Sequence, residues 1–247
     1  MHEMLKNLVE RLHENAGANL ESVTLYGSAA GGHLVEVHSD LNVLCTMRSL
    51  GVEELRRISG VVKWWTTTQH QPAPLFFTSQ ELREAADVFA IELLDMQQNH
   101  QVLYGSDVVA GISVPMNLHR IQVEHELRTA LLKLRQHFLM AAENHADLAA
   151  VLAKSASSIL TLLRHTLIAF EEKVPATPRE IFERVAALTG AGASSFEIGL
   201  RLRQNRAAEP ELVRAFGTYL SALERVISAL ENRAPKHRLQ RVSKATS

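Results

Sequence analysis

The residues best suited to chemistry in this sequence lie where one β-type run ends and the next begins. The run SVTLYG (22–27) ends in Gly27, and Ser28 follows it directly. A glycine lets backbone amides approach a ligand closely, and a serine offers both a hydroxyl and an N–H group to a phosphate. Gly27 and Ser28 are therefore candidates for binding the phosphates of a nucleotide.

Two candidate metal ligands follow after a short loop. Eleven residues separate Ser28 from Asp40, and Asp40-x-Asn42 opens an apolar run that continues through residues 43–45. Residues two apart on a strand point to the same face of the sheet. Carboxylate and amide oxygens are ligands that Mg²⁺ accepts. The spacing therefore predicts half of a Mg²⁺–nucleotide site beside the Gly27 turn.

This segment resembles the nucleotidyltransferase superfamily, whose signature is Gly-Ser, a loop of similar length, and then Asp-x-Asp or Asp-x-Glu. The resemblance covers residues 20–105 and includes QVLYG (101–105), which is similar to the LYG-like segment of such domains. It implies a domain that binds a nucleoside triphosphate, with ATP as the expected nucleotide, together with Mg²⁺. In such enzymes, a nucleoside monophosphate passes to a hydroxyl group of a small molecule or a protein, and pyrophosphate is released.

The resemblance also implies a role for individual residues. Ser28 would bind a phosphate, Asp40 would be the first metal ligand, and Asn42 would occupy the second ligand position. Glu92 falls in VFAIELLDM (88–96), which we interpret as a strand, and it would be the third ligand or the catalytic base.

Asp95 is an alternative third acid, three residues further along the same run. On a strand, that spacing would turn Asp95 to the opposite face from Glu92. We therefore favour Glu92.

Two departures from the family pattern concern charge. The second acid of the motif is Asn42 here, which keeps an oxygen ligand but removes one negative charge. The turn after Ser28 reads Ala-Ala-Gly-Gly (29–32) and has no basic residue. Two interpretations follow: a working transferase, or a catalytically degenerate relative that binds a nucleotide or a partner without turnover. A third hypothesis gives the function to the helical half as an interaction module.

The first half of the chain alternates strand-type and helix-type patterns. Short apolar runs between turn signals predict strands, and Thr78-x-x-Glu81 predicts a capping box at the start of a helix. Residues 55–65 carry a helical apolar stripe that ends at Trp65, and we expect Trp65 in the core. Cys45 lies in the apolar strand and is expected to be buried.

The second half is helical throughout. Five amphipathic segments follow Pro115, and Thr177-Pro178 with Glu180 is a strong helix start, while Gly190 is a stop. These patterns predict an α+β fold with three parts. They are a nucleotidyltransferase-like mixed sheet with flanking helices (1–114), an antiparallel helical bundle (115–231) and a basic tail (232–247).

Composition limits the function classes. The chain has 247 residues with 26 Lys+Arg against 27 Asp+Glu, and its tail from residue 232 contributes five positive charges, so the preceding 231 residues carry a net −6. We therefore expect no nucleic-acid partner for the body of the protein. The single Cys45 excludes an intrachain disulfide, and we see no signal peptide and no run approaching a membrane span, so we expect a cytoplasmic protein. The acceptor stays unidentified, and the sequence leaves a homodimer open.

Overall fold

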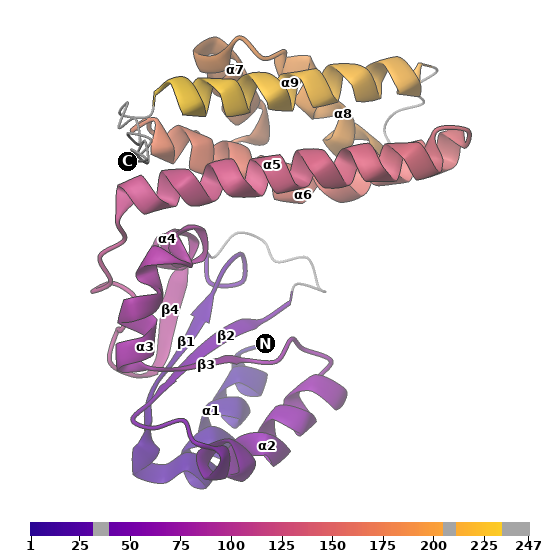
Figure 1. Cartoon of the computed structure of the whole chain (residues 1–247). Helices are drawn as coiled ribbons and strands as arrows, with labels where there is room; N and C mark the ends of the chain where they lie inside the picture. The colour runs from indigo at the N-terminus through magenta and orange to yellow at the C-terminus, as the bar shows by residue number, and fades with distance from the viewer. Residues whose placement is uncertain (32–39, 205–210, 234–247) are drawn as a thin grey trace, which may run out of the picture. The chain divides into compact units, whose positions relative to one another are not determined.

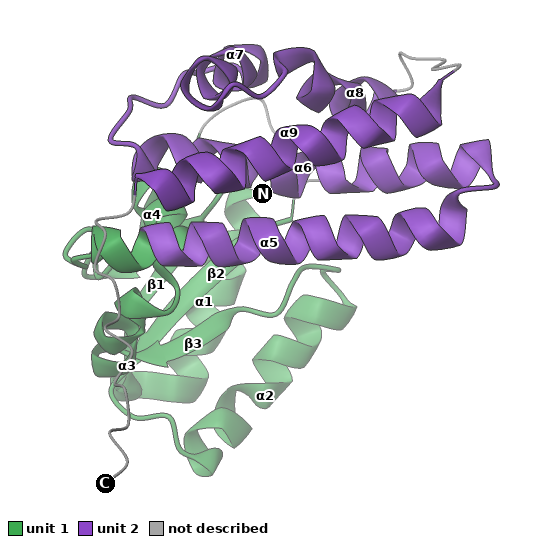
Figure 2. Cartoon of the chain, turned by 45° about the horizontal axis from the view of Figure 1, so that its top comes forward, with its two compact units in different colours: residues 1–119 green, residues 120–247 purple. Residues whose placement is uncertain are grey.

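The computed structural model describes residues 1–31, 40–204 and 211–233. The chain divides into two compact units, residues 1–119 and 120–247, which Figure 2 shows in different colours. Unit 1 combines a small mixed sheet with helices, and the described part of unit 2 is helical. The α+β class predicted from the sequence is confirmed. Residues 32–39, which belong to the loop expected before Asp40, and residues 234–247 of the basic tail lie outside the described residues.

Unit 1 begins with a helix and then alternates strands with helices (Figure 1). In chain order, its elements are α1 (His2–Ala16), the 3₁₀ turn η1 (Gly17–Asn19), β1 (Leu20–Tyr26), β2 (Asn42–Met47), α2 (Val52–Thr67), β3 (Leu75–Thr78), α3 (Ser79–Glu84), the 3₁₀ turn η2 (Ala85–Asp87), α4 (Ala90–Gln98) and β4 (His100–Gly105). The capping box is formed as predicted, because the Thr78 hydroxyl accepts from the Glu81 N–H and the Glu81 carboxylate accepts from the Thr78 N–H.

The four strands of unit 1 form one sheet in the order β3-β2-β1-β4. β1 is antiparallel to both β2 and β4, whereas β2 and β3 run parallel and are joined through α2. β1 and β2 pair from Leu20↔Met47 to Tyr26↔Asn42, so the end of β1 meets the start of β2. The predicted strands before and after Asp40 are therefore neighbours in the sheet.

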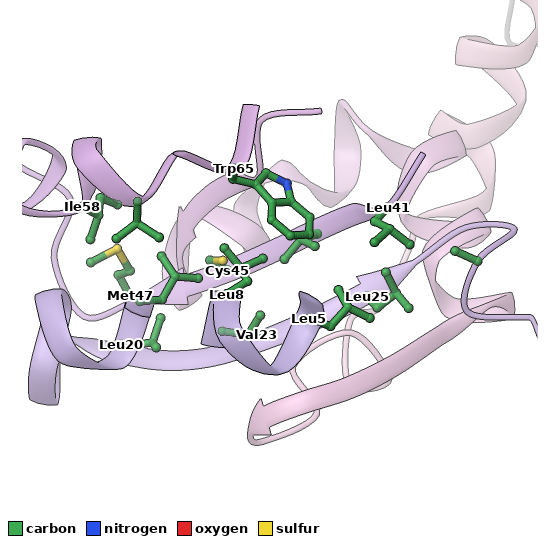
Figure 3. Close-up of a cluster of buried hydrophobic side chains, with 14 residues drawn as sticks. Leu5, Leu8, Leu20, Val23, Leu25, Leu41, Cys45, Met47, Ile58 and Trp65 are labelled. Atoms are coloured by element: carbon green, nitrogen blue, oxygen red, sulfur yellow. The ribbon is translucent and has the colours of Figure 1, made fainter. Parts of the chain in front are cut away.

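Each face of the sheet is covered by helices. Alternate residues of β1 and β2, including Val23 and Cys45, pack with α1 and α2, in a cluster that contains Trp65 (Figure 3). Trp65 is fully buried, and its indole N–H donates to the Pro72 carbonyl at 2.9 Å. The intervening Leu44 packs on the other face in a cluster with residues of α3 and α4. The predictions that Trp65 and Cys45 are buried are confirmed.

One predicted strand is wrong. Residues 88–96 do not form a strand, because Ala90–Gln98 folds as α4. Its buried residues Ala90, Leu93 and Met96 recur every three positions, which is a helical stripe, and most of its residues favour helices. A short apolar run can be read either way from periodicity alone, and the helical alternative is the correct one here.

The described residues from 116 onward form five helices, in agreement with the five amphipathic segments. They are α5 (Met116–Ala141), α6 (His145–Ala169), α7 (Pro178–Thr189), α8 (Ala193–Arg203) and α9 (Leu212–Asn232). α7 starts with the predicted capping box of Thr177 and Glu180 and ends at Gly190, which has φ +71°. The predicted start and stop of this helix are confirmed.

α6 is the most apolar helix of unit 2. By length and composition, it is the one described helix that could cross a membrane, with a mean hydropathy of 1.5 over its best window. Our expectation that no segment approaches such a span was therefore too strict. The core helix of a bundle passes the same test, and nine residues of α6 are buried among its neighbours.

Candidate nucleotide site

The turn at the end of β1 is built on Gly27. Its φ of +82° is a conformation that other residues rarely adopt. The Gly27 N–H donates to the Asn99 carbonyl at 2.9 Å, and the Ala30 N–H closes the turn onto the Gly27 carbonyl at 3.0 Å. Ser28 is exposed at the tip of this turn. Its side chain is therefore accessible to a ligand, as a phosphate-binding role requires.

The two candidate metal ligands lie next to this turn. Asn42 is the first residue of β2 and pairs directly with Tyr26, the last residue of β1. Leu41 is buried in the cluster with α1 and α2, so Asp40 and Asn42 on either side of it belong to the opposite face. Asp40 is exposed and Asn42 is half-buried. The structure thus brings Gly27, Ser28 and the Asp40-x-Asn42 motif to one corner of the sheet.

The start of β2 is held in place by a side chain from the β3 side of the sheet. The Leu41 N–H, between the two candidate ligands, donates to Gln71 Oε1 at 2.8 Å. Gln71 lies just before β3, the strand that pairs with β2. This bond fixes the backbone from which Asp40 and Asn42 project.

Glu92 is positioned differently from the prediction. It lies in the first turn of α4 and is exposed, and Asp95 lies one turn further along and is half-buried. Because both acids lie on a helix, strand alternation does not distinguish Glu92 from Asp95. Over residues 1–31, 40–204 and 211–233, no group of three or more His, Cys, Asp or Glu side chains could hold a metal ion. The metal roles of Asp40, Asn42 and Glu92 stay predictions.

A histidine near the site was missed by the sequence analysis. His100, the first residue of β4, pairs with Tyr26, so Asn42, Tyr26 and His100 form one row across β2, β1 and β4. The ring of His100 contacts the Met96 carbonyl through Nδ1 at 3.0 Å and Asp107 through Nε2 at 3.0 Å. The hydrogen bond to Asp107 raises the pKa of His100 above its ordinary value.

Asp107 receives further hydrogen bonds that favour its charged form. Its Oδ1 accepts from the N–H groups of Val109 at 3.1 Å and Ala110 at 3.0 Å. These bonds, with that from His100, lower the pKa of Asp107. The pair anchors the start of β4 next to Asn99, whose carbonyl holds Gly27. The sequence signal was weak, since the contact spans seven residues and depends on the Gly105 turn.

Asp40, Asn42 and Ser28 are suited to a single Mg²⁺–phosphate group. They offer one carboxylate, one amide and one hydroxyl, all of which are oxygen donors to a hard cation or partners for a phosphate. Mg²⁺ in nucleotide sites is usually bound through one or two carboxylates, with phosphates and water completing its shell. The described residues therefore fit a metal that arrives with the nucleotide.

The chain has a nucleotidyltransferase-like fold. The chain is similar to the crystal structure of spectinomycin adenyltransferase AAD(9) from Enterococcus faecialis with ATP and spectinomycin, with a TM-score of 0.55 and 15% sequence identity, over 94% of this chain and 99% of that one. At this identity, the likeness establishes the fold. No family description and no curated protein sequence matches the chain.

Proposed function

We propose that this protein binds a nucleoside triphosphate, with ATP as the expected nucleotide, together with one Mg²⁺ at the Gly27 corner of the sheet. The observation that carries the proposal is the pairing of Tyr26 with Asn42, which places the Gly27–Ser28 turn beside Asp40-x-Asn42. Phosphates would meet the N–H and hydroxyl groups of the turn, and Asp40 would share the metal with them.

The charge of the corner favours binding over rapid turnover. Two-metal transfer stabilises both the attacking and the leaving oxygen, and it relies on several carboxylates to hold the ions. Here, Asn42 supplies no charge, and the turn at residues 29–31 has no cation. A single Mg²⁺–nucleotide complex requires fewer charged ligands from the protein than a two-metal centre does.

Nucleotidyl transfer is the second candidate, and the structural likeness over nearly the whole chain favours it. In that reaction, an acceptor hydroxyl oxygen would attack the α-phosphorus, pyrophosphate would leave, and the hydroxyl proton would pass to a base. Glu92 is our candidate for that base or for a further metal ligand. The acceptor would be a small molecule or a protein.

Titration calorimetry with Mg²⁺-ATP tests the binding proposal. We expect binding by the intact chain, a large loss with Asp40→Ala and a smaller loss with Ser28→Ala. Glu53→Ala, which removes an exposed acid of α2 in the same unit, is the matched control and should bind as the parent does. Absence of any heat of binding at millimolar Mg²⁺-ATP would contradict the proposal.

A label-transfer assay separates the two candidates. ATP labelled at the α-phosphate is incubated with the protein, Mg²⁺ and either hydroxyl compounds or cell lysate. Metal-dependent transfer that Asp40→Ala abolishes would establish the transferase, and Glu92→Gln would then test the base. Binding of ATP without any transfer supports a protein that binds the nucleotide without catalysis.

A further inference from the structure

Unit 2 contains a cavity of about 480 Å³ between α5 and α6, two helices that lie alongside one another in Figures 1 and 2. All its lining residues belong to these two helices, so it is complete within unit 2. Its volume lies in the range of small-molecule pockets, roughly 300–1,000 Å³. None of the residues assigned to the nucleotide corner lines it.

The cavity has a structural origin. α5 is tied to α9 by long side chains, through the Arg135–Glu224 ion pair at 2.5 Å and the packing of Phe138 on Phe216 with ring centroids 5.0 Å apart. Towards α6, in contrast, several of the facing residues are small. They include Ala130 on α5 and Ser155 and Ser158 on α6. Short side chains cannot fill the space between two helices whose separation is set elsewhere, and a cavity results.

The interior of the cavity is apolar. Leu134, Ile159 and Leu162 are all buried and form part of its lining. A ligand with a hydrocarbon or aromatic body would gain about 25 cal/mol for each Å² of apolar surface that it buries there. This surface accounts for affinity but does not select a particular chemistry.

The charged residues of the lining determine which kind of ligand the cavity selects. The cavity is bordered by Glu126, Lys133 and His137 from α5, and by Asp147 and Lys154 from α6. No ion pair involves any of these five within the described residues, although arginines elsewhere in unit 2 are paired, for example Arg128 with Glu124 at 3.0 Å. The two lysines are therefore available to a ligand from opposite helices.

Neither acid of the lining neutralises the lysines. The charge of Asp147 is compensated by the N-terminus of its own helix, and Glu126 lies far from Lys133. Asp147 lies in the first turn of α6, where the helix N-terminus stabilises a negative charge. Glu126 lies seven residues from Lys133, or about 10 Å along the helix axis, and charges that far apart at a surface are largely screened at physiological salt. The middle of the cavity is thus the favourable place for an anion.

We infer that unit 2 binds a small organic anion, a carboxylate or phosphate monoester on an apolar body, whose charged group lies between Lys133 and Lys154. The apolar body would contact Leu134, Ile159 and Leu162. Ser158 keeps a free lone pair on its hydroxyl, which donates to the Ser155 carbonyl at 3.0 Å. This site differs from the nucleotide corner in both its location and its chemistry.

A matched series of naphthalene compounds tests the inference on the full-length chain. The probes are 1-naphthoate, 1-naphthyl phosphate, 1-naphthalenemethanol and 1-naphthylmethylammonium, with dissociation constants measured by NMR titration. We expect the anions to bind more tightly than the alcohol and the ammonium to bind most weakly. The ratio of the two anions shows whether a carboxylate or a phosphate is preferred.

Substitution of the lysines should remove that preference. Lys133→Met and Lys154→Met should each weaken anion binding by roughly fivefold, the value of a partly exposed charge pair, and leave the alcohol unaffected. Lys173→Met, an exposed lysine outside the cavity in the same unit, should change nothing. Asp40→Ala should also leave naphthoate binding intact, so failure of the nucleotide proposal is distinguishable from failure here.

Three results would overturn the inference. They are an ammonium probe that binds as tightly as the carboxylate, anion affinities that survive both lysine substitutions, and absence of binding by every probe. Ala130→Leu, which fills part of the cavity, supplies an independent check. It should weaken all four probes without lowering the unfolding temperature, and unchanged affinities would contradict the assigned position.

Discussion

The side-chain amide nitrogen of Asn42 lies 3.5 Å from the point that a Cβ atom on Gly27 would occupy. The contact follows from the register of the sheet, since Asn42 pairs with Tyr26, the residue before Gly27. The bare Cα of Gly27 leaves room for the Asn42 side chain over the turn. The conformation of the Gly27 turn and the position of the Asn42 side chain are therefore coupled.

Gly27→Ala should affect both stability and nucleotide binding. At φ +82° an alanine is strained by about 1–2 kcal/mol, and its Cβ contacts the Asn42 amide. We expect a loss of that size in the free energy of unfolding, measured in urea, and a loss of Mg²⁺-ATP affinity measured by calorimetry.

Gly60→Ala is the matched control for Gly27→Ala. Gly60 lies within α2, and a Cβ there would meet nothing within 4 Å. Alanine should therefore stabilise the protein by about 0.5–1 kcal/mol and leave ATP binding unchanged. If Gly27→Ala bound ATP as well as Gly60→Ala does, the turn would not be the phosphate site.

Asn42→Asp should tighten Mg²⁺ binding in the presence of ATP. The substitution adds one negative charge at the position where the resemblance places the second acid, and we expect a gain on the order of tenfold. Asn15→Asp, on the exposed side of α1, changes the net charge equally but lies away from the corner. Equal metal affinities for the two variants would show that position 42 does not face the metal.

The sequence was sufficient to predict much of the fold because its signals there are local. Strand-type runs bounded by glycines and prolines became β1 to β4, and the capping boxes of Thr78 and Thr177 begin α3 and α7. Each of these signals depends on residues within about one helical turn or one strand of each other. Tertiary packing did not need to be known.

The sequence-based predictions failed where tertiary packing determines the local structure. Residues 88–96 are apolar enough for a buried strand or a buried helix, and only their packing beneath the sheet selects the helix that carries Glu92. The contact between His100 and Asp107 depends on the path of the chain through Gly105, which no local pattern specifies. The row of Asn42, Tyr26 and His100 required the register of three strands.

The pair of His100 and Asp107 should make stability depend on pH in two directions. The pKa of His100 is raised from 6.5, so its contribution is complete below 6.5 and is lost as pH rises through the raised value. The pKa of Asp107 is lowered from 3.8, so its contribution is complete above 3.8 and is lost as pH falls through the lowered value. The His100–Asp107 pair should therefore stabilise the fold most between pH 3.8 and pH 6.5.

Urea unfolding at several pH values measures this effect. His100→Gln should lose about 1 kcal/mol between pH 4 and pH 6.5, and much less at pH 9, where His100 of the parent has also lost its positive charge. His125→Gln, on the exposed surface of α5, should follow the parent at every pH. A loss for His100→Gln that stayed constant across the pH range would mean that the ion pair contributes nothing.

Gly105→Ala should be more damaging than any other glycine substitution considered above. Gly105 has φ +74°, and a Cβ there would lie 1.9 Å from the Glu21 carbonyl oxygen, so the backbone of β1 or β4 must move. We expect a loss of roughly 3 kcal/mol or more in unfolding free energy, because strain and backbone displacement add together.

Gly111→Ala provides the comparison for Gly105→Ala, since a Cβ there would meet nothing within 4 Å. Its stability should stay within about 0.5 kcal/mol of the parent. Gly105→Ala should also weaken Mg²⁺-ATP binding, because a shift of β4 moves Asn99, whose carbonyl holds the Gly27 N–H at 2.9 Å. If a folded Gly105→Ala protein bound ATP normally, the α4–β4 junction would not position the phosphate turn.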